Sequence, residues 1–291
     1  MEVALTGSTG FIGTSLMKYL SGRDSLILSP FDKNKYSLAS VESLKDFVGN
    51  KDIIIHLAGV TKTINNNDYY TINTTYTRNL LEAISLYGKK NVKFIFLSSF
   101  AVYEELTKPT LLDEDKTKTI PHNEYGISKL AAEKYIKVYH QEKNINVYIL
   151  RLANVYGPGM TQTTRSIIYD CIKSIQSNKP IIVDGDGKQM RDFIYIDDII
   201  QAITKCIYSQ AHNFLIVNIC SSAKIEIIKL IKDIERMLNK KAVIQFNKNY
   251  REKGYWIGNN KKAYKKINFK PKVNLENGLK KTIDWYLKNL I

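Results

Sequence analysis

The chain has few cysteines and no long apolar run. Its 291 residues include 3 cysteines, Cys171, Cys206 and Cys220, with no CxxC pair and no nearby histidine. This pattern argues against a disulfide framework and shows no zinc site, so we expect three reduced, mostly buried thiols and no metal. No apolar stretch approaches the roughly 18 residues of a membrane-spanning helix. The N-terminus also lacks the charged and apolar regions of a secretion signal, so we expect a soluble, cytoplasmic protein.

Acidic residues are scarce near the C-terminus. The formal charge is +15, and residues 224–291 contain 18 Lys and Arg against 6 Asp and Glu, a net +12. A basic lobe suits a phosphorylated small molecule, a nucleic acid or an acidic surface, and solvated lysines are the alternative. The lysine clusters lack interleaved aromatic residues, which argues against a nucleic-acid platform. We therefore expect no nucleic-acid partner.

Short apolar runs alternate with helical patterns in the first half of the chain. Residues 73–88 and 125–141 show the i, i+3, i+4 apolar spacing of helices. The strand candidates are 2–7, 25–29, 51–59, 92–99 and 146–157. Such alternation is typical of an α/β fold whose parallel sheet is covered by helices. After a Gly-Pro-Gly break at residues 157–159 the alternation is no longer strict.

A glycine triplet lies between the first predicted strand and the first helical pattern. Gly7, Gly10 and Gly13 have the spacing GxxGxxG in "TGSTGFIG". Glycine lets backbone amides approach a pyrophosphate at the positive end of a helix dipole, and the motif requires this strand-turn-helix context. We predict a Rossmann-type doubly wound parallel sheet. Residues 1–157 with parts of 190–220 would form the dinucleotide-binding domain, and 158–291 mainly a smaller substrate-binding α/β lobe.

One helical turn separates Tyr125 from Lys129 in "YGISK". Residues at i and i+4 lie about 5–6 Å apart between Cβ atoms on one helix face. A free tyrosine has a pKa of about 10, but an adjacent ammonium favours the phenolate and makes the ring a usable acid/base. Ser99, at the end of the predicted strand 92–99, would bring a hydroxyl to the same sheet edge. A surface pair on an amphipathic helix is the alternative.

The order of these motifs resembles the extended short-chain dehydrogenase/reductase family, which contains nucleotide-sugar epimerases, dehydratases and ketoreductases. The matching segments are "TGSTGFIG", "KDIIIHLAG", "NTTYTRNLLEA", "FLSSFAVY", "YGISK", "LRLANVYGPG", "GDGKQMRDFIYIDDI" and "INFKPKVNLENGLKKTIDWY". They run nearly end to end. The resemblance implies an NAD(P)-dependent enzyme acting on a nucleotide sugar in polysaccharide biosynthesis. It also implies a homodimer formed through the helices that contain "NTTYTRNLLEA" and "YGISKLAAEKY".

The same resemblance implies roles for individual residues. Catalysis would fall to Ser99, Tyr125 and Lys129, and Lys129 would also hold the cofactor ribose. The substrate would be bound by Ser99, Asn154, Arg191 and Arg251, with the arginines at its diphosphate, because a guanidinium can donate two bonds there. The cofactor would contact Gly7, Thr9, Gly10, Phe11, Ile12, Gly13, Ser29, Asp32, Leu57, Ala58, Gly59, Asn73, Ser98, Tyr125 and Lys129.

Two departures from the family pattern bear on the reaction. Phe100 and Ala101 stand where sugar-nucleotide dehydratases carry an Asp-Glu pair, and neither side chain can exchange a proton. Ser29 stands where an acidic residue at the end of the second strand would hold the adenosine ribose and repel a 2′-phosphate. Lys33 and Lys35 could reach such a phosphate, whereas Asp32 could return to the ribose and keep NAD competitive. Dehydration is therefore disfavoured, and NADPH is favoured over NAD.

These observations predict a 4-keto-sugar-nucleotide reductase that uses NADPH, with NAD as the alternative cofactor. An NAD-dependent 4-epimerase is the alternative reaction. A non-catalytic cofactor-binding protein is a third reading, although such proteins usually lose the Tyr and Lys. Asp192 and Asp197 are expected to be structural, and His56 to be a hydrogen-bonded core residue. Neither His56 nor His122 is expected to catalyse.

Overall fold

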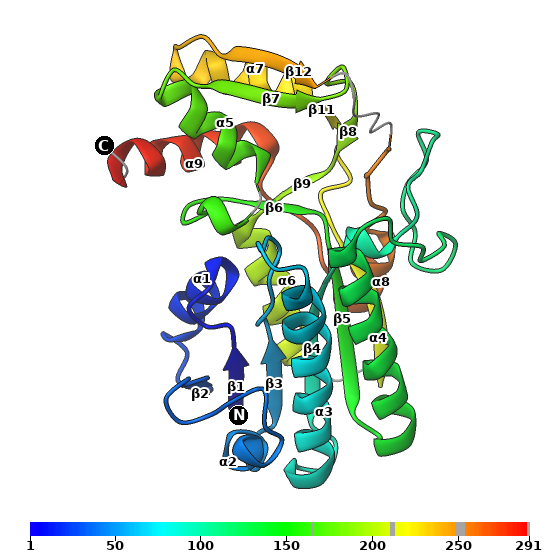
Figure 1. Ribbon diagram of the computed structural model, residues 1–291. Helices are drawn as coiled ribbons and strands as arrows, with labels where there is room; N and C mark the ends of the chain where they lie inside the picture. The colour runs from blue at the N-terminus through cyan, green and yellow to red at the C-terminus, as the bar shows by residue number, and fades with distance from the viewer. Residues whose placement is uncertain (165, 210–212, 248–253, 290–291) are drawn as a thin grey trace.

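The computed structural model describes residues 1–164, 166–209, 213–247 and 254–289. A six-stranded sheet forms its body, with the order β10-β5-β4-β3-β1-β2 and every neighbouring pair parallel (Figure 1). The strands are β1 (Glu2–Thr6), β2 (Ile27–Pro30), β3 (Ile53–His56), β4 (Lys93–Ser99), β5 (Asn146–Leu152) and β10 (Phe214–Ile219). The strand order switches direction at β1, so the crevice expected of a doubly wound sheet lies at the carboxyl ends of β1 and β3. The predicted fold class is confirmed.

Helices cover both faces of this sheet. Strand residues alternate between the faces, so that Ile95 and Leu97 of β4 join one apolar core, and Phe94 and Phe96 join another. One face carries α1 (Phe11–Leu20) and α6 (Ile196–Tyr208). The other, toward the viewer in Figure 1, carries η1 (Glu42–Leu44), α2 (Lys45–Val48), α3 (Tyr76–Tyr87) and α4 (Glu124–Lys143). Burial on both faces explains why these strands read as continuous apolar runs.

The predicted strand at 146–157 is in fact two strands. The chain leaves the main sheet at Ala153, whose amide still bonds to the Ile219 carbonyl, and Asn154 then donates its amide to the Asp192 carbonyl. From there β6 (Asn154–Tyr156) pairs in parallel with β9 (Phe193–Tyr195). A uniform apolar run does not reveal this change of partner.

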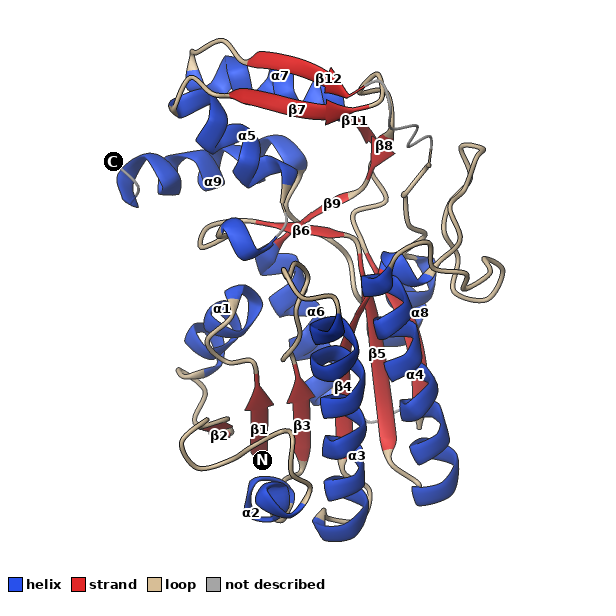
Figure 2. Cartoon of the chain, viewed as in Figure 1, coloured by secondary structure: helices blue, strands red, loops and turns tan. Residues whose placement is uncertain are grey.

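A smaller lobe lies above the carboxyl ends of the strands (Figure 2). It contains the parallel pair β7 (Pro180–Asp184) and β12 (Val243–Asn247), with α5 (Ile167–Gln176), α7 (Ile227–Leu238) and α9 (Leu275–Asn289). The antiparallel pair β8 (Met190–Arg191) and β11 (Ile225–Glu226) follows. In contrast, α8 (Lys261–Ile267) packs beside β10 of the main sheet. The domain boundaries therefore stay a prediction.

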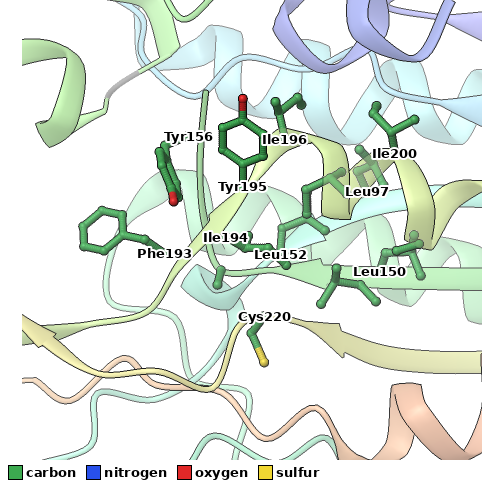
Figure 3. Packing of buried hydrophobic residues seen from close by; sticks show 14 of the residues in the cluster. Leu97, Leu150, Leu152, Tyr156, Phe193, Ile194, Tyr195, Ile196, Ile200 and Cys220 are labelled. Atoms are coloured by element: carbon green, nitrogen blue, oxygen red, sulfur yellow. The ribbon is translucent and has the colours of Figure 1, made fainter. Parts of the chain in front are cut away.

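One apolar core continues from the main sheet into the lobe. Figure 3 shows Leu97, Leu150 and Leu152 of the sheet beside Ile194 and Ile196 at the β9–α6 junction. This packing holds the two parts together beneath the site described next. The three cysteines are free and buried, as predicted. Within the described ranges, no helix combines the length and apolar character needed to cross a bilayer.

Candidate active site

The glycine loop brings the start of α1 close to the loop after β3. Gly7 has a φ of +69°, and a Cβ there would lie 2.6 Å from the Ala58 nitrogen. A Cβ on Gly13 would overlap the Gly7 carbonyl oxygen. Gly10 is the N-cap of α1, so no side chain shields the amides of the first helical turn. This bare helix start fits a cofactor pyrophosphate, which the glycine-loop amides would hold.

A cavity of about 610 Å³ extends from this loop to the base of the lobe. It brings together twelve of the predicted site residues: Gly7, Gly10, Phe11, Ile12, Gly13, Leu57, Gly59, Ser98, Ser99, Tyr125, Asn154 and Arg191. Thr9, Ser29, Asp32, Ala58, Asn73 and Lys129 lie outside its described lining. Arg251 lies outside the residues that the structure describes. The charged side chains of the described lining are Lys62 and Arg191, so the cavity suits an anionic ligand.

Tyr125 reaches the cavity because a glycine follows it. Asn123 caps α4 by accepting a 2.8 Å bond from the Gly126 amide. A Cβ on Gly126 would overlap the Ala101 carbonyl oxygen, so only glycine lets the first turn of α4 touch η3 (Phe100–Val102). Because η3 directly follows Ser99, this contact sets Tyr125 and Ser99 in the same cavity. Ser99 Oγ accepts a 3.2 Å bond from the Ala101 amide.

Lys129 lies just beneath the cavity wall. Its side chain is buried, and Nζ donates a 2.9 Å bond to the Leu97 carbonyl while lying 4.7 Å from the centre of the Phe96 ring. A Cβ on Gly59 would be 3.3 Å from Nζ, so the ammonium lies against this cavity-lining residue. Desolvation lowers the pKa of Lys129 to about 8, and the charge of Glu133 opposes that shift. The ammonium therefore lies where it can act on a group bound in the cavity.

Asn73 is fully buried and supports the site from behind. Its Oδ1 accepts a 2.8 Å bond from the Val60 amide, and its Nδ2 donates to the Val60 carbonyl and to Ser128 Oγ, each at 3.0 Å. Ser128 Oγ in turn donates to the Tyr125 carbonyl at 2.8 Å. Asn73 belongs to a π-helical segment, η2 (Tyr69–Thr75), that precedes α3 where a regular helix was predicted. Such π segments are frequent at functional sites, and this one ties the loop after β3 to α4.

Ser29 and Asp32 do not reach the cavity. Ser29 Oγ accepts a 2.8 Å bond from Lys51 Nζ, which also forms a 3.2 Å ion pair with Glu2. The strand continues to Pro30, so Ser29 is not its last residue. The first carboxylate beyond β2 is Asp32, which is exposed and accepts a 2.9 Å bond from the Asn34 amide. Lys51 lies more than twenty positions from Ser29, so sequence reasoning had no signal for this contact.

The cavity wall that carries Asn154 and Arg191 is organised around Asp192. Its carboxylate accepts bonds from Ser221 (amide and hydroxyl), Ser222 and Gly258 at 2.6–3.2 Å, and its carbonyl accepts from Asn154 Nδ2 at 2.9 Å. Desolvation raises the pKa of this carboxyl to about 6, against these four bonds. The structural role predicted for Asp192 is confirmed. Asp197 lies in the first turn of α6, and its structural role stays a prediction.

Arg191 and Asn154 therefore sit on a fixed wall. Arg191 Nη1 donates 2.9 Å bonds to the carbonyls of Met190 and Gly254. The Asp192 amide bonds to the Trp256 carbonyl at 3.0 Å, which continues the wall to Trp256. Both Arg191 and Asn154 line the cavity, on the side away from the glycine loop.

His122 and Trp256 were missed as site residues. Both line the cavity, with their ring centres 5.2 Å apart. His122 lies three residues before Tyr125, but an isolated histidine or tryptophan carries no motif that would mark it. His56, in contrast, is a core residue as predicted: it bonds to Thr6 and Thr77 through its two ring nitrogens. Burial lowers its pKa to about 3, so it stays neutral.

Known proteins are similar to this chain in sequence and in fold. The sequence model of the NAD dependent epimerase/dehydratase family matches residues 3–220. A UDP-glucuronate 4-epimerase of Thermodesulfobacterium geofontis is 32% identical over 244 residues, which cover 81% of this chain and 73% of that protein. A Bacillus subtilis protein described as an uncharacterized UDP-glucose epimerase is 30% identical over 320 residues, with coverage of 100% and 99%.

Solved structures give the same grouping. The UDP-glucuronic acid 4-epimerase of Bacillus cereus, in complex with UDP-glucuronic acid and NAD, matches with a TM-score of 0.86 at 28% identity over 100% of both chains. RMD from Pseudomonas aeruginosa, complexed with NADPH, matches with a TM-score of 0.87 at 25% identity over 99% of both chains. The family predicted from the motif order is confirmed: the chain belongs to the NAD dependent epimerase/dehydratase family.

Proposed function

We propose that the chain is an NAD-dependent 4-epimerase of a nucleotide-activated sugar, with a UDP-hexose as the substrate class. This reading takes the place of the 4-ketoreductase that the sequence favoured. The names of the relatives support it, since three of the proteins described above are called UDP-sugar epimerases. The observation that carries the chemistry is the single cavity that joins the glycine loop to Ser99 and Tyr125 and then to Arg191.

The residues of that cavity suit oxidation and reduction at one sugar carbon better than elimination of water. Phe100 is buried and Ala101 is aliphatic, so the positions of the dehydratase Asp-Glu pair hold no proton carrier. Tyr125 would take the proton of the sugar 4-hydroxyl and later return it, and Ser99 would hydrogen-bond to the same oxygen. Lys129 would stabilise the phenolate. Asn154, Arg191 and Arg251 would hold the nucleotide, with the arginines at its diphosphate.

NAD suits the site better than NADPH. When bound, this cofactor would supply the hydride acceptor and donor for the sugar C4. Ser29 Oγ is occupied by Lys51, so Asp32, the first carboxylate after β2, would be the partner of an adenosine ribose. Thr61, after β3, donates a 3.0 Å bond to the Thr163 carbonyl, and both residues line the cavity.

The experiment is a panel of UDP-hexoses and their 4-keto derivatives incubated with the purified protein, with and without added NADPH. An epimerase forms the C4 epimer over many turnovers, with no net absorbance change at the nicotinamide band and with NAD found in the protein. The 4-ketoreductase stays the second candidate, since Lys33 and Lys35 closely follow Asp32 and one structural neighbour is complexed with NADPH. Consumption of one NADPH per 4-keto sugar, with no epimerisation, would overturn the proposal in its favour.

A further inference from the structure

A buried ion pair lies directly behind the proposed acid/base residues. Glu133 follows Lys129 by one turn of α4, and both side chains are at most 6% exposed. Arg151 on β5 grips the Glu133 carboxylate with two bonds, Nε to Oε1 at 3.0 Å and Nη2 to Oε2 at 2.7 Å. Ser98 Oγ donates a third bond to Oε1 at 2.5 Å. The pair therefore links α4 to the ends of β4 and β5.

Stability alone is a weak reason to keep such a pair. Taking two charges out of water has a large desolvation cost, and well-packed apolar side chains of similar volume often stabilise a fold equally well. The hydrogen bonding of the ion pair is also incomplete, because Arg151 Nη1 is buried with no hydrogen-bond partner in the described part of the chain. Arg151 instead lies 4.8 Å from the centre of the Tyr103 ring. A buried ion pair with this desolvation cost and incomplete hydrogen bonding points to a role in the neighbouring site.

We propose that Glu133, held by Arg151 and Ser98, is a positioning residue that keeps Lys129 charged and fixes the end of β4 that carries Ser99. This inference rests on the proposed function, in which the Lys129 ammonium stabilises the Tyr125 phenolate. Ser98 and Ser99 are neighbours on β4, so the bond from Ser98 to Glu133 also fixes the strand at the cavity. Arg151 pairs in register with Ser98 and completes the support from β5.

The groups around Lys129 show why a counter-charge matters. On α4 they are Tyr125 and Glu133, on β3 His56, on β5 Arg151 beyond Glu133, and on η2 Tyr69, whose ring lies 6.1 Å from that of Tyr125. His56 is neutral, so Glu133 is the nearby negative charge among these groups. Desolvation lowers the pKa of Lys129 and Glu133 raises it. Without Glu133, the ammonium would lose its proton at a lower pH.

The test measures the titration of Lys129 directly, without substrate. Protein labelled with ¹³Cε-lysine is titrated by NMR, and the Lys129 signal is assigned by its loss in Lys129→Arg. Glu133→Gln should lower the Lys129 pKa by about 1 unit, the low end of the effect of a nearby opposite charge. Glu142→Gln, an exposed glutamate on the same helix, is the matched control and should leave it unchanged.

A second variant keeps the inference falsifiable if Glu133→Gln does not fold. Glu133→Gln/Arg151→Met removes both charges at similar volume and should fold as well as the wild type. It should still lower the Lys129 pKa, by less than Glu133→Gln alone, because the more distant Arg151 charge is lost as well. The alkaline limb of the turnover-pH profile should move with it in the same direction. A folded variant in which the Lys129 signal titrates as in the wild type would overturn the inference. Because this titration needs no sugar nucleotide, its outcome is separate from that of the proposed 4-epimerase activity.

Discussion

Gly126→Ala should remove most of the activity while leaving the protein folded. The new methyl group would overlap the Ala101 carbonyl oxygen and lie 2.8 Å from the Pro121 side chain. The first turn of α4 must then move away from η3, and Tyr125 moves with it. A misplacement of about 1 Å at a reacting group can reduce the rate by about 10²-fold.

The effect on stability should be small by comparison. Overpacking costs about 1–3 kcal/mol, and replacing glycine by alanine inside a helix returns up to about 1 kcal/mol. The assay is the epimerisation rate beside a thermal melt, with Gly22→Ala as control, because a Cβ there has no neighbour within 4 Å. Turnover of Gly126→Ala within about threefold of wild type would refute the account of how Tyr125 is positioned, since a misplaced acid/base should lose about 10²-fold.

Three further predictions concern single residues. Tyr125→Phe should lower turnover by about 10²–10⁴-fold and leave NAD binding intact by fluorescence titration; turnover near wild type would reject the acid/base role. Arg191→Ala and Arg251→Ala should each weaken UDP-sugar binding by about 1.5–3 kcal/mol in calorimetry without changing NAD affinity; unchanged binding in both would show that neither contacts the nucleotide. The pKa of Asp192 is raised from 3.8 to about 6, so the folded state binds this proton more tightly than the unfolded state. The Asp192 contribution to stability should therefore fall as pH rises from 4 to 6 and stay constant above. If the melting temperatures of the wild type and Asp192→Asn change in parallel over that pH range, the prediction is contradicted.

Local signals predicted much of the fold. The glycine triplet, the alternating runs and the Tyr125–Lys129 spacing each depend on residues close together in the chain, and sequence shows such patterns directly. The end of β5 at Ala153 depends instead on Asp192, which lies far along the chain and whose carbonyl accepts the hydrogen bond of the Asn154 amide. An apolar run cannot reveal which strand its amides will bond to, so one strand was predicted where the structure has two.

The site was predicted unevenly for the same reason. Motif residues such as Ser99 and Tyr125 meet in the cavity because Gly126 allows the contact between α4 and η3. The contact of Ser29 with Lys51 was not foreseen, because the two residues are far apart in sequence and only the folded sheet brings them together. His122 and Trp256 come from loops that are far apart in sequence, so only the folded chain shows that they line one cavity.

The most direct test of the central claim follows the hydrogen at the sugar C4. The purified protein is incubated with a UDP-hexose deuterated at C4 and no added cofactor, and the product is analysed by NMR and mass spectrometry. If the protein is an NAD-retaining 4-epimerase, the C4 epimer forms over many turnovers per protein molecule and keeps its deuterium at C4. Loss of the deuterium, or no C4 epimer while a UDP-4-keto-hexose is reduced by stoichiometric added NADPH, would contradict the account.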